Sequence, residues 1–181
     1  MMDSGDSTLV EQALAGHNRS FDLLVDKYYK IVYNVALKMV FDRENAADIT
    51  QSVFLKAYTN LKSFNKKYKF FSWVYRIAVN ESLNFLNGND QRTELLDDSI
   101  ASEQTPETIA LQSDLETKIE SALSKLRPDN RAVIVLAHYQ GLSYREIAET
   151  LGIAEKTVKS RLFTSRQMLK EILLKDRVID V

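Results

Sequence analysis

The chain has 181 residues, of which 45% are hydrophobic and 27% are charged, and its formal net charge is −1. These values are typical of one or two globular domains and exclude a disordered polyelectrolyte. With 5 Gly, 2 Pro and no Cys, the chain lacks the turn formers of a β-sandwich or barrel and the thiols of a disulfide framework, a thiolate metal site or a cysteine nucleophile.

The first half of the chain is expected to form four helices, because apolar residues recur there at helical spacing. Asp6 and Ser7 are candidate N-caps of a first helix over 8–15, which Gly16 would end. The other three helices are expected over about 20–40, 45–61 and 71–86. A polar, basic loop over 63–69 precedes the last of them. Four helices in so short a stretch predict a small all-α domain.

The middle of the chain has the composition of a linker. Residues 88–104 show no apolar period, and the stretch 88–126 carries 3 Lys and Arg against 9 Asp and Glu. The flanking stretches are mildly basic, with net charges of +2 over 1–87 and +3 over 127–181. We therefore expect two domains, over 1–87 and 105–181, joined by a flexible acidic linker over 88–104.

A helix is expected to resume at 105–106, where a threonine cap is followed by proline in the first turn, and to run to about Leu126. The Arg-Pro pair at 127–128 would break it, and a further helix is expected over 129–139. The run Val-Ile-Val-Leu over 133–136 also fits a β-strand. Its helical neighbours and the lack of a pairing partner favour a helix.

The motif with the most specific spacing lies over 141–162. Ser143 is a predicted helix cap, and Glu146, three residues later, would complete a capping box. Gly152 supplies a tight turn before a second helix over about 155–174. This pattern is typical of a DNA-binding helix-turn-helix, whose second helix enters the major groove. An αα-hairpin with a merely solvated outer face has the same pattern.

The outward face of this second helix combines cations, hydroxyls and one aromatic ring. Its members are Lys156, Thr157, Lys159, Ser160, Phe163, Thr164 and Arg166. Cations and hydroxyls reach phosphates and base edges, and an aromatic ring can contact a thymine methyl group. We therefore expect this face to bind duplex DNA.

A second constellation mixes aromatic and basic residues over the loop and the start of the fourth helix. Its aromatic members are Phe64, Tyr68, Phe70, Phe71, Trp73 and Tyr75, and its basic members are Lys66, Lys67, Lys69 and Arg76. Rings that stack on unpaired bases and cations that follow phosphates are typical of single-stranded nucleic-acid binding. Alternatively, half of these rings form the core of the predicted four-helix domain.

With these motifs in this order, the sequence resembles the extracytoplasmic-function (ECF) group of bacterial sigma factors over nearly its whole length. The stretch 21–29 is similar to the start of that family's first conserved region, and 47–58 is similar to the helix that binds the β′ coiled coil of RNA polymerase. The stretch 71–80 resembles the helix that reads the minus-ten element, and the helix-turn-helix resembles the reader of the minus-thirty-five element. The resemblance implies a two-domain, all-α sigma factor that directs promoter-specific transcription initiation.

The resemblance also implies roles for individual residues. Polymerase docking would involve Asp48, Gln51, Ser52 and Phe54. Capture of the non-template strand and of a flipped base of the minus-ten element would involve Asn65, Lys66, Lys67, Tyr68, Trp73, Tyr75, Arg76 and Asn80. Contacts with the minus-thirty-five duplex would involve Lys156, Thr157, Lys159, Ser160, Arg161, Phe163, Thr164 and Arg166. The implied partners are RNA polymerase core (through its β′ coiled coil and β flap), promoter DNA and an anti-sigma protein.

Three positions depart from the family pattern. Ser52 stands where the family commonly has an acidic residue. The loop 65–68 is more basic than the family's Arg-Gly-acid-Ser run and lacks its glycine, which leaves the preferred flipped base open. Thr164 and Ser165 replace a frequent Arg-Ala pair, which changes the contacts available to phosphates and bases.

Nothing in the sequence predicts chemistry of the chain's own. There is no glycine-rich phosphate loop and no supported Ser/His/Asp set, and His17 and His138 have no partner at metal-ligand spacing. We therefore expect no enzyme activity, no metal and no cofactor. Because no run of about 18 apolar residues is present and the acidic, polar N-terminus is unlike a signal peptide, we expect a cytoplasmic protein.

Two other functional classes are open from the residues alone. A repressor or activator that binds duplex DNA as a homodimer would need a dimer seam and a palindromic site with half-sites about one helical turn apart. A protein-interaction module that only carries a helix-turn-helix would show no DNA-dependent activity.

Overall fold

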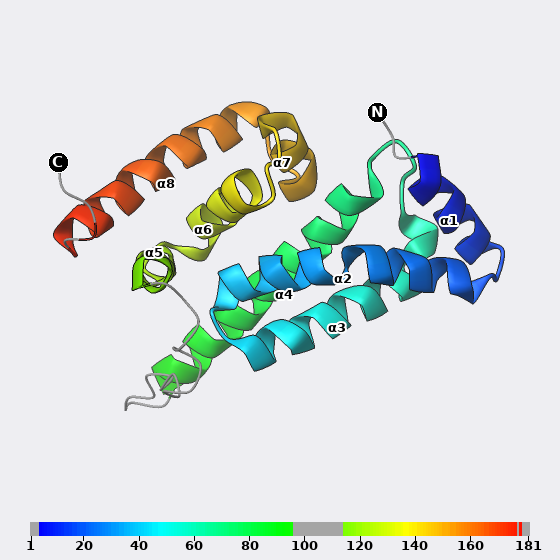
Figure 1. Cartoon of the computed structure of the whole chain (residues 1–181), viewed down its shortest axis with the longest axis horizontal. Coiled ribbons are helices and arrows are strands. Elements are labelled where there is room, and N and C mark those ends of the chain that lie inside the picture. The colour runs from blue at the N-terminus through cyan, green and yellow to red at the C-terminus, as the bar shows by residue number, and fades with distance from the viewer. Residues whose placement is uncertain (1–3, 96–113, 177, 179–181) are drawn as a thin grey trace.

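The structure of this protein is a computed structural model that describes residues 4–95, 114–176 and 178. Within these residues it contains helices and turns and no strand, so the predicted all-α class is confirmed. The helices form two lobes, an N-terminal lobe of residues 4–95 and a C-terminal lobe of residues 114–176 (Figure 1). No helix in the described part is both long enough and apolar enough to cross a membrane.

The N-terminal lobe contains the four predicted α-helices. They are α1 (Ser4–Leu14), α2 (Asn18–Val40), α3 (Arg43–Thr59) and α4 (Phe70–Leu95), with a short 3-10 turn, η1 (Leu61–Ser63), after α3. The central helix is α2, which packs against α1, α3 and α4 (Figure 1). Asp42 caps the start of α3, because its carboxylate accepts a hydrogen bond of 2.7 Å from the Asn45 N–H.

The core of this lobe follows the helical periodicity of the sequence. Leu24 and Val32 of α2 are completely buried, and they meet the equally buried Val53 of α3 and Val74 of α4 in one hydrophobic cluster. Burial of a large aliphatic side chain stabilises a fold by about 1.5–3 kcal/mol. The lobe is therefore stabilised by the apolar stripes that predicted its helices.

The predicted start of the first helix is wrong. Helix α1 begins at Ser4, so Asp6 lies inside its first turn and is not an N-cap. The Asp6 carboxylate instead accepts hydrogen bonds from the Tyr28 hydroxyl and from Lys27 Nζ of α2. Since hydrogen bonds to a buried charged group stabilise more than an exposed local cap, the contact with α2 decides where this carboxylate lies.

The predicted end of the fourth helix is also wrong. Helix α4 continues past Leu86 to Leu95. Most residues over 91–95 favour helix, so the backbone hydrogen bonds continue although the apolar period has ended. The predicted linker over 88–104 therefore begins within α4, and its part over 96–104 lies outside the described residues. The exact division of the chain into domains stays a prediction.

The C-terminal lobe contains α5 (Asp114–Ser124), α6 (Pro128–Ile134), a π-helical turn η3 (Val135–Tyr139), α7 (Tyr144–Leu151) and α8 (Glu155–Lys175). The helical interpretation of the run 133–136 is confirmed, since α6 passes directly into η3 there. The predicted helix start at 105–106 lies outside the described residues. Helix α8 packs on α5, α6 and α7 and lies on the side of this lobe away from α2 and α3 (Figure 1).

The two lobes pack against each other. Helix α4 contacts α7, and α2 contacts η3, α5 and α6. The buried residues of both lobes belong to one hydrophobic cluster, which includes Met39 of α2 and Leu136 of η3. The sequence left the relative placement of the lobes open, and the structure brings them into direct contact.

Candidate nucleic-acid interface

The helix-turn-helix is formed as its capping residues predict. The Glu146 N–H donates to Ser143 Oγ at 3.3 Å, and the Ser143 N–H donates to Glu146 Oε2 at 3.0 Å, which completes the capping box. Gly152 ends α7 in the left-handed conformation with φ +67°, where glycine avoids the steric cost of a Cβ atom. Val158 and Leu162 of α8 are buried against the rest of the lobe. The predicted motif is confirmed in its local geometry.

The outward face of α8 is open to solvent. Its exposed members are Lys156, Lys159, Ser160, Phe163, Thr164 and Arg166, whereas Thr157 and Arg161 are half-buried. The Phe163 ring is 66% exposed. An exposed ring can contact a thymine methyl group while the neighbouring cations and hydroxyls reach phosphates and base edges, which favours a DNA-binding face over a merely solvated one.

One cation of this face contacts a histidine of the π-helical turn η3. Arg166 Nε donates to His138 Nε2 at 3.2 Å. Partial burial and the Arg166 charge both lower the pKa of His138, so its ring is neutral at pH 7 and acts as the acceptor. His138 therefore has a positioning role that its spacing in the sequence did not indicate.

In the aromatic and basic constellation, three rings pack on one another. The ring centroids of Phe64 and Trp73 lie 5.3 Å apart, and the Phe70 ring lies 5.6 Å from Phe64 and 5.8 Å from Trp73. Phe70 is buried, while Phe64 and Trp73 are half-buried. These three rings join the loop to the start of α4. For them, the alternative that the rings form part of the domain core is therefore confirmed.

The loop that these rings support is exposed. Asn65, Lys66, Lys67 and Tyr68 are all exposed, and the Tyr68 ring is 47% exposed. The Asn65 Oδ1 atom accepts a hydrogen bond of 3.0 Å from the Lys67 N–H, which fixes the turn through its own side chain. Tyr68 is therefore the exposed ring of the loop, presented between cations on a shaped turn.

Two other residues with an implied minus-ten role contact the C-terminal lobe. Tyr75 is only 5% exposed, its hydroxyl donates to Gln140 Oε1 at 3.2 Å, and burial raises its pKa to about 12. Arg76 donates from Nε to the Thr150 carbonyl at 2.8 Å and from Nη2 to the Glu149 carbonyl. The structure thus places these two residues at the contact between the lobes, where Tyr75 is buried and Arg76, like Asn80, remains exposed.

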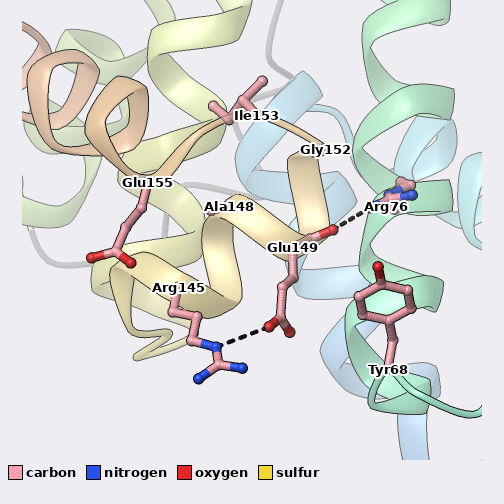
Figure 2. A pocket seen from close by; sticks show the side chains of 8 residues that line it. All are labelled: Tyr68, Arg76, Arg145, Ala148, Glu149, Gly152, Ile153 and Glu155. Atoms are coloured by element: carbon pink, nitrogen blue, oxygen red, sulfur yellow. Dashed lines mark hydrogen bonds and ion pairs between the residues drawn. The ribbon is translucent and has the colours of Figure 1, made fainter.

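A pocket of about 250 Å³ lies between the loop and the helix-turn-helix (Figure 2). Tyr68 and Arg76 line it from the N-terminal lobe. From the C-terminal lobe it is lined by Arg145, Ala148, Glu149, Gly152, Ile153 and Glu155. Within the described part of the chain, no cluster of three His, Asp or Glu side chains fits a metal ion.

Beside this pocket, an ion pair joins the lobes. Lys69 Nζ lies 2.6 Å from Glu146 Oε1. The hydrogen bond from Lys69, together with the N–H of Ser143, lowers the pKa of Glu146 to about 2. The same carboxylate that caps α7 therefore also binds the N-terminal lobe, a double use that the capping pattern alone did not reveal.

The residues with an implied polymerase role lie on α3. Asp48 and Gln51 are exposed and Ser52 is half-buried. The Phe54 ring, however, is only 7% exposed and stacks on Tyr29 at 6.2 Å, so it supports the helix from inside. The exposed apolar side chain is its neighbour Leu55.

Leu55 is 66% exposed and was missed in the sequence. It follows Gln51 by four residues and Ser52 by three, so all three lie on one helical face. That spacing is the signal that distinguishes Leu55 from Phe54.

The chain matches two family models, sigma-70 region 2 over residues 24–92 and sigma-70, region 4 over residues 116–169. It is 31% identical to the RNA polymerase sigma-H factor of Pseudomonas aeruginosa over 93% of each chain. It is 33% identical to the ECF RNA polymerase sigma-E factor of Haemophilus influenzae over 91% of this chain and 93% of that relative. The fold is similar to that of CnrH in its solved complex with the cytosolic domain of CnrY. The two structures match over 96% of this chain and 99% of the matched chain, with a TM-score of 0.73 and 26% sequence identity.

These similarities span both lobes, and they place region 2 over α2 to α4 and region 4 over α5 to α8. The helix-turn-helix and the aromatic loop lie within the matched segments. The chain therefore belongs to the sigma-70 family, in its ECF group, whose members direct RNA polymerase to promoters.

Proposed function

We propose that the C-terminal lobe reads the minus-thirty-five duplex with the outward face of α8. The observation that carries this proposal is the exposed Phe163 ring on a correctly capped helix-turn-helix. Lys156, Lys159 and Arg166 contact phosphates and base edges, and Phe163 contacts a thymine methyl group. The residues Thr157, Ser160, Arg161 and Thr164 complete the face, with the half-buried Thr157 and Arg161 at its border.

The N-terminal lobe reads the minus-ten element through the loop that precedes α4. Tyr68 stacks on an unpaired base, because its ring is exposed on a turn flanked by Lys66 and Lys67. Trp73 acts through the loop, since its ring packs on Phe64 and Phe70. Asn65, Arg76, Asn80 and Tyr75 complete the proposed surface, and of these Tyr75 and Arg76 contact the C-terminal lobe in this structure. Unstacking a base costs a few kcal/mol, and a stacking contact offsets about 1–3 kcal/mol of that cost.

Polymerase core docks on the exposed face of α3. This face contains Asp48, Gln51 and Ser52, with Leu55 as the apolar contact in place of the buried Phe54. A carboxylate and an amide around an exposed leucine combine specificity with apolar burial. The position after Gln51 is a serine, so this chain offers one acidic group fewer than the family pattern.

We further propose that the chain works in the cytoplasm, carries out no chemistry of its own and takes no cofactor. The polymerase supplies catalysis, and the chain supplies recognition. A regulatory anti-sigma protein binds it. CnrH, whose fold is similar, is likewise bound by another protein, the cytosolic domain of CnrY.

Run-off transcription with purified polymerase core and a genomic promoter library tests this function. Promoter-dependent transcripts that require the added chain are expected. Their complete absence would overturn the proposal. A footprint on a palindromic site without polymerase, together with a dimer in light scattering, would instead indicate a conventional repressor or activator.

A further inference from the structure

Helix α1 lies beside the loop that precedes α4, although it is outside the segment that matches the sigma-70 region 2 model. That segment begins at residue 24, whereas α1 ends at Leu14. The helix packs on α2 and on η1, the turn that leads into the loop (Figure 1). Val10 of α1 is completely buried in the hydrophobic core. The helix is therefore a fixed neighbour of the loop over 64–69, which we call the minus-ten loop.

Two side chains of α1 make polar contacts with α2. Asp6 is only 5% exposed, and its carboxylate accepts hydrogen bonds from the Tyr28 hydroxyl and from Lys27 Nζ. Gln12 Oε1 accepts a further bond of 2.8 Å from Ser20 Oγ. Burial and the Asp6 carboxylate both raise the pKa of the Tyr28 hydroxyl, so this group stays protonated and remains the donor. Because bonds to a charged acceptor are the stronger ones, the Asp6 contact fixes the position of the Tyr28 ring.

The Tyr28 ring continues this contact towards the minus-ten loop. Its centroid lies 5.7 Å from that of the buried Phe70 ring. Phe70 in turn packs on Phe64 at 5.6 Å and on Trp73 at 5.8 Å. Ring pairs at such separations attract one another in preferred orientations. These contacts connect Asp6 of α1 with Phe64 of the loop.

A second contact reaches the loop from the solvent side. Lys66 Nζ lies 2.8 Å from Glu11 Oε1 of α1, and both side chains are exposed. Lys66 is the central residue of the turn in which Asn65 Oδ1 accepts a hydrogen bond from the Lys67 N–H. An exposed ion pair contributes little to stability, so the main effect of Glu11 is on the position of this turn. Helix α1 thus contacts the loop both through the core and from outside.

We propose that α1 positions the minus-ten loop for base stacking through two residues, Asp6 and Glu11. Asp6 acts through the rings of the core, and Glu11 acts through Lys66. This inference rests on the proposed function of the loop and extends it to residues that do not touch DNA. A Tyr68 ring on a loose turn must be ordered when the base arrives, and the lost entropy weakens binding. A turn that α1 already holds in place avoids that loss.

The fluorescence of Trp73, the only tryptophan in the chain, tests the inner contact in the full chain without polymerase or DNA. Tyr28→Phe keeps the ring and removes the hydroxyl that Asp6 holds. Because a released ring loosens the packing of Phe70 on Trp73, we expect emission at longer wavelength and faster quenching by acrylamide. The matched control is Tyr33→Phe, which removes a hydroxyl from a half-buried tyrosine of the same helix and should change neither quantity.

Circular dichroism verifies that these variants fold. Asp6→Asn, which keeps an acceptor but removes the charge, supplies the same measurement if Tyr28→Phe does not fold. Unchanged Trp73 emission and quenching in a folded variant would overturn the inner contact.

Promoter opening in the holoenzyme, measured by permanganate reactivity of unpaired thymines, tests both contacts. Tyr28→Phe and Glu11→Gln should each lower opening about two- to five-fold, while core affinity and the upstream footprint stay unchanged. The matched control for Glu11→Gln is Asp176→Asn, which removes the same charge and an exposed ion pair with Lys125. It should open promoters like the native chain.

The sign of the Glu11→Gln effect separates positioning from simple charge. A carboxylate beside the path of the strand repels phosphates, so its removal would strengthen binding if charge alone mattered. Opening at or above the native level in Glu11→Gln would overturn the role of Glu11. The same result in Tyr28→Phe would overturn the role of Asp6.

A double-mutant cycle shows whether α1 acts through Tyr68. If it does, Tyr28→Phe should have little further effect on opening once Tyr68→Ala has removed the stacking ring. Fold-changes that simply multiply would show that α1 only supports the core and would overturn the proposal. If Tyr68→Ala alone leaves opening unchanged, the proposed function of the loop fails, and this inference fails with it. A loss in Tyr68→Ala without any loss in Tyr28→Phe or Glu11→Gln would overturn this inference alone.

Discussion

The two proposed DNA-reading surfaces differ in their availability. The face of α8 is open, with Phe163 66% exposed. The corresponding helix of the N-terminal lobe, α4, has Tyr75 buried and Arg76 bound to α7. In the helix-turn-helix, α8 faces solvent while α7 contacts α4. The difference shows that one proposed reading surface is exposed along its outward face, whereas the other shares Tyr75 and Arg76 with the opposite lobe.

The largest expected effect concerns Arg131, which serves both lobes at once. The residue is only 5% exposed, and its guanidinium donates to the carbonyls of Leu123, Ser124 and Leu126 as well as to that of Met39. Replacing Arg131 by Met leaves these carbonyls unpaired, so we expect a loss of about 3–5 kcal/mol in unfolding free energy, measured by denaturant titration.

The control for this measurement is Arg145→Met, because the Arg145 side chain is 81% exposed and its loss should change stability by less than about 0.5 kcal/mol. Equal stability of the two variants would contradict the assigned hydrogen bonds, including the bond from Arg131 to the Met39 carbonyl that joins the lobes.

The next effect separates the two roles assigned to aromatic residues. Trp73→Ala should cost about 2–3 kcal/mol of stability, because the ring packs on Phe64 and Phe70. It should also impair promoter opening while upstream duplex contacts remain largely intact. Tyr68→Ala should leave stability within about 0.5 kcal/mol but lower opening about ten-fold, since its exposed ring is the proposed stacking contact.

Permanganate reactivity of unpaired thymines in the holoenzyme–promoter complex measures the opening, and a footprint measures the upstream contact. If Tyr68→Ala opens promoters normally, the exposed ring is not the stacking platform. If Trp73→Ala weakens both contacts equally, the division between lobes fails.

The open face of α8 can be tested on duplex DNA. The double variant Lys159→Ala and Arg166→Ala should lower the affinity for upstream promoter duplex about ten-fold or more. Because two phosphate contacts are lost, the slope of log affinity against log salt concentration should become shallower by roughly two. Lys170→Ala, an exposed cation outside the proposed set, is the matched control. Titrations of labelled duplex at several salt concentrations measure both quantities, and an unchanged salt slope would exclude this face as the DNA contact.

The smallest expected effect is the acid dependence of Glu146. Its pKa in the fold, about 2, is below the ordinary value of 4.5, so its contribution to stability is complete above about pH 4.5 and is lost as the pH falls towards 2. With allowance for its partial exposure, Glu146→Gln should lose about 1 kcal/mol at pH 7. Thermal melts at several pH values should show this difference disappearing near pH 2, and a difference independent of pH would contradict the ion pair with Lys69.

Much of the local structure was predictable because its causes lie within a few residues. The Ser143–Glu146 capping box and the Gly152 turn needed only neighbouring residues, and both are present. The exposed α8 face followed from the same helical spacing that buries Val158 and Leu162.

The contact between the lobes was not predictable in this way. The Arg76–Thr150 bond joins residues 74 positions apart, and its acceptor is a backbone carbonyl that every residue carries. Phe54 and Leu55 give a second example, because both are apolar. The packing of α3 on α2 decides that Phe54 is buried against Tyr29 and that Leu55 is exposed. Periodicity identifies the faces of a helix, but the pairing of faces across lobes depends on shape.

The π-helical turn η3 carries a mechanical consequence. The Gln140 N–H reaches back five residues to the Val135 carbonyl, so the turn holds one residue more than an α-helical turn. Two side chains at the end of this turn contact the other lobe. The Tyr139 ring lies 5.3 Å from the Lys38 ammonium, and Gln140 accepts a hydrogen bond from the Tyr75 hydroxyl. Deleting one residue here would rotate the elements that follow η3 by about 100° about the axis of this helical turn. The orientation of the helix-turn-helix relative to α4 therefore depends on this one extra residue.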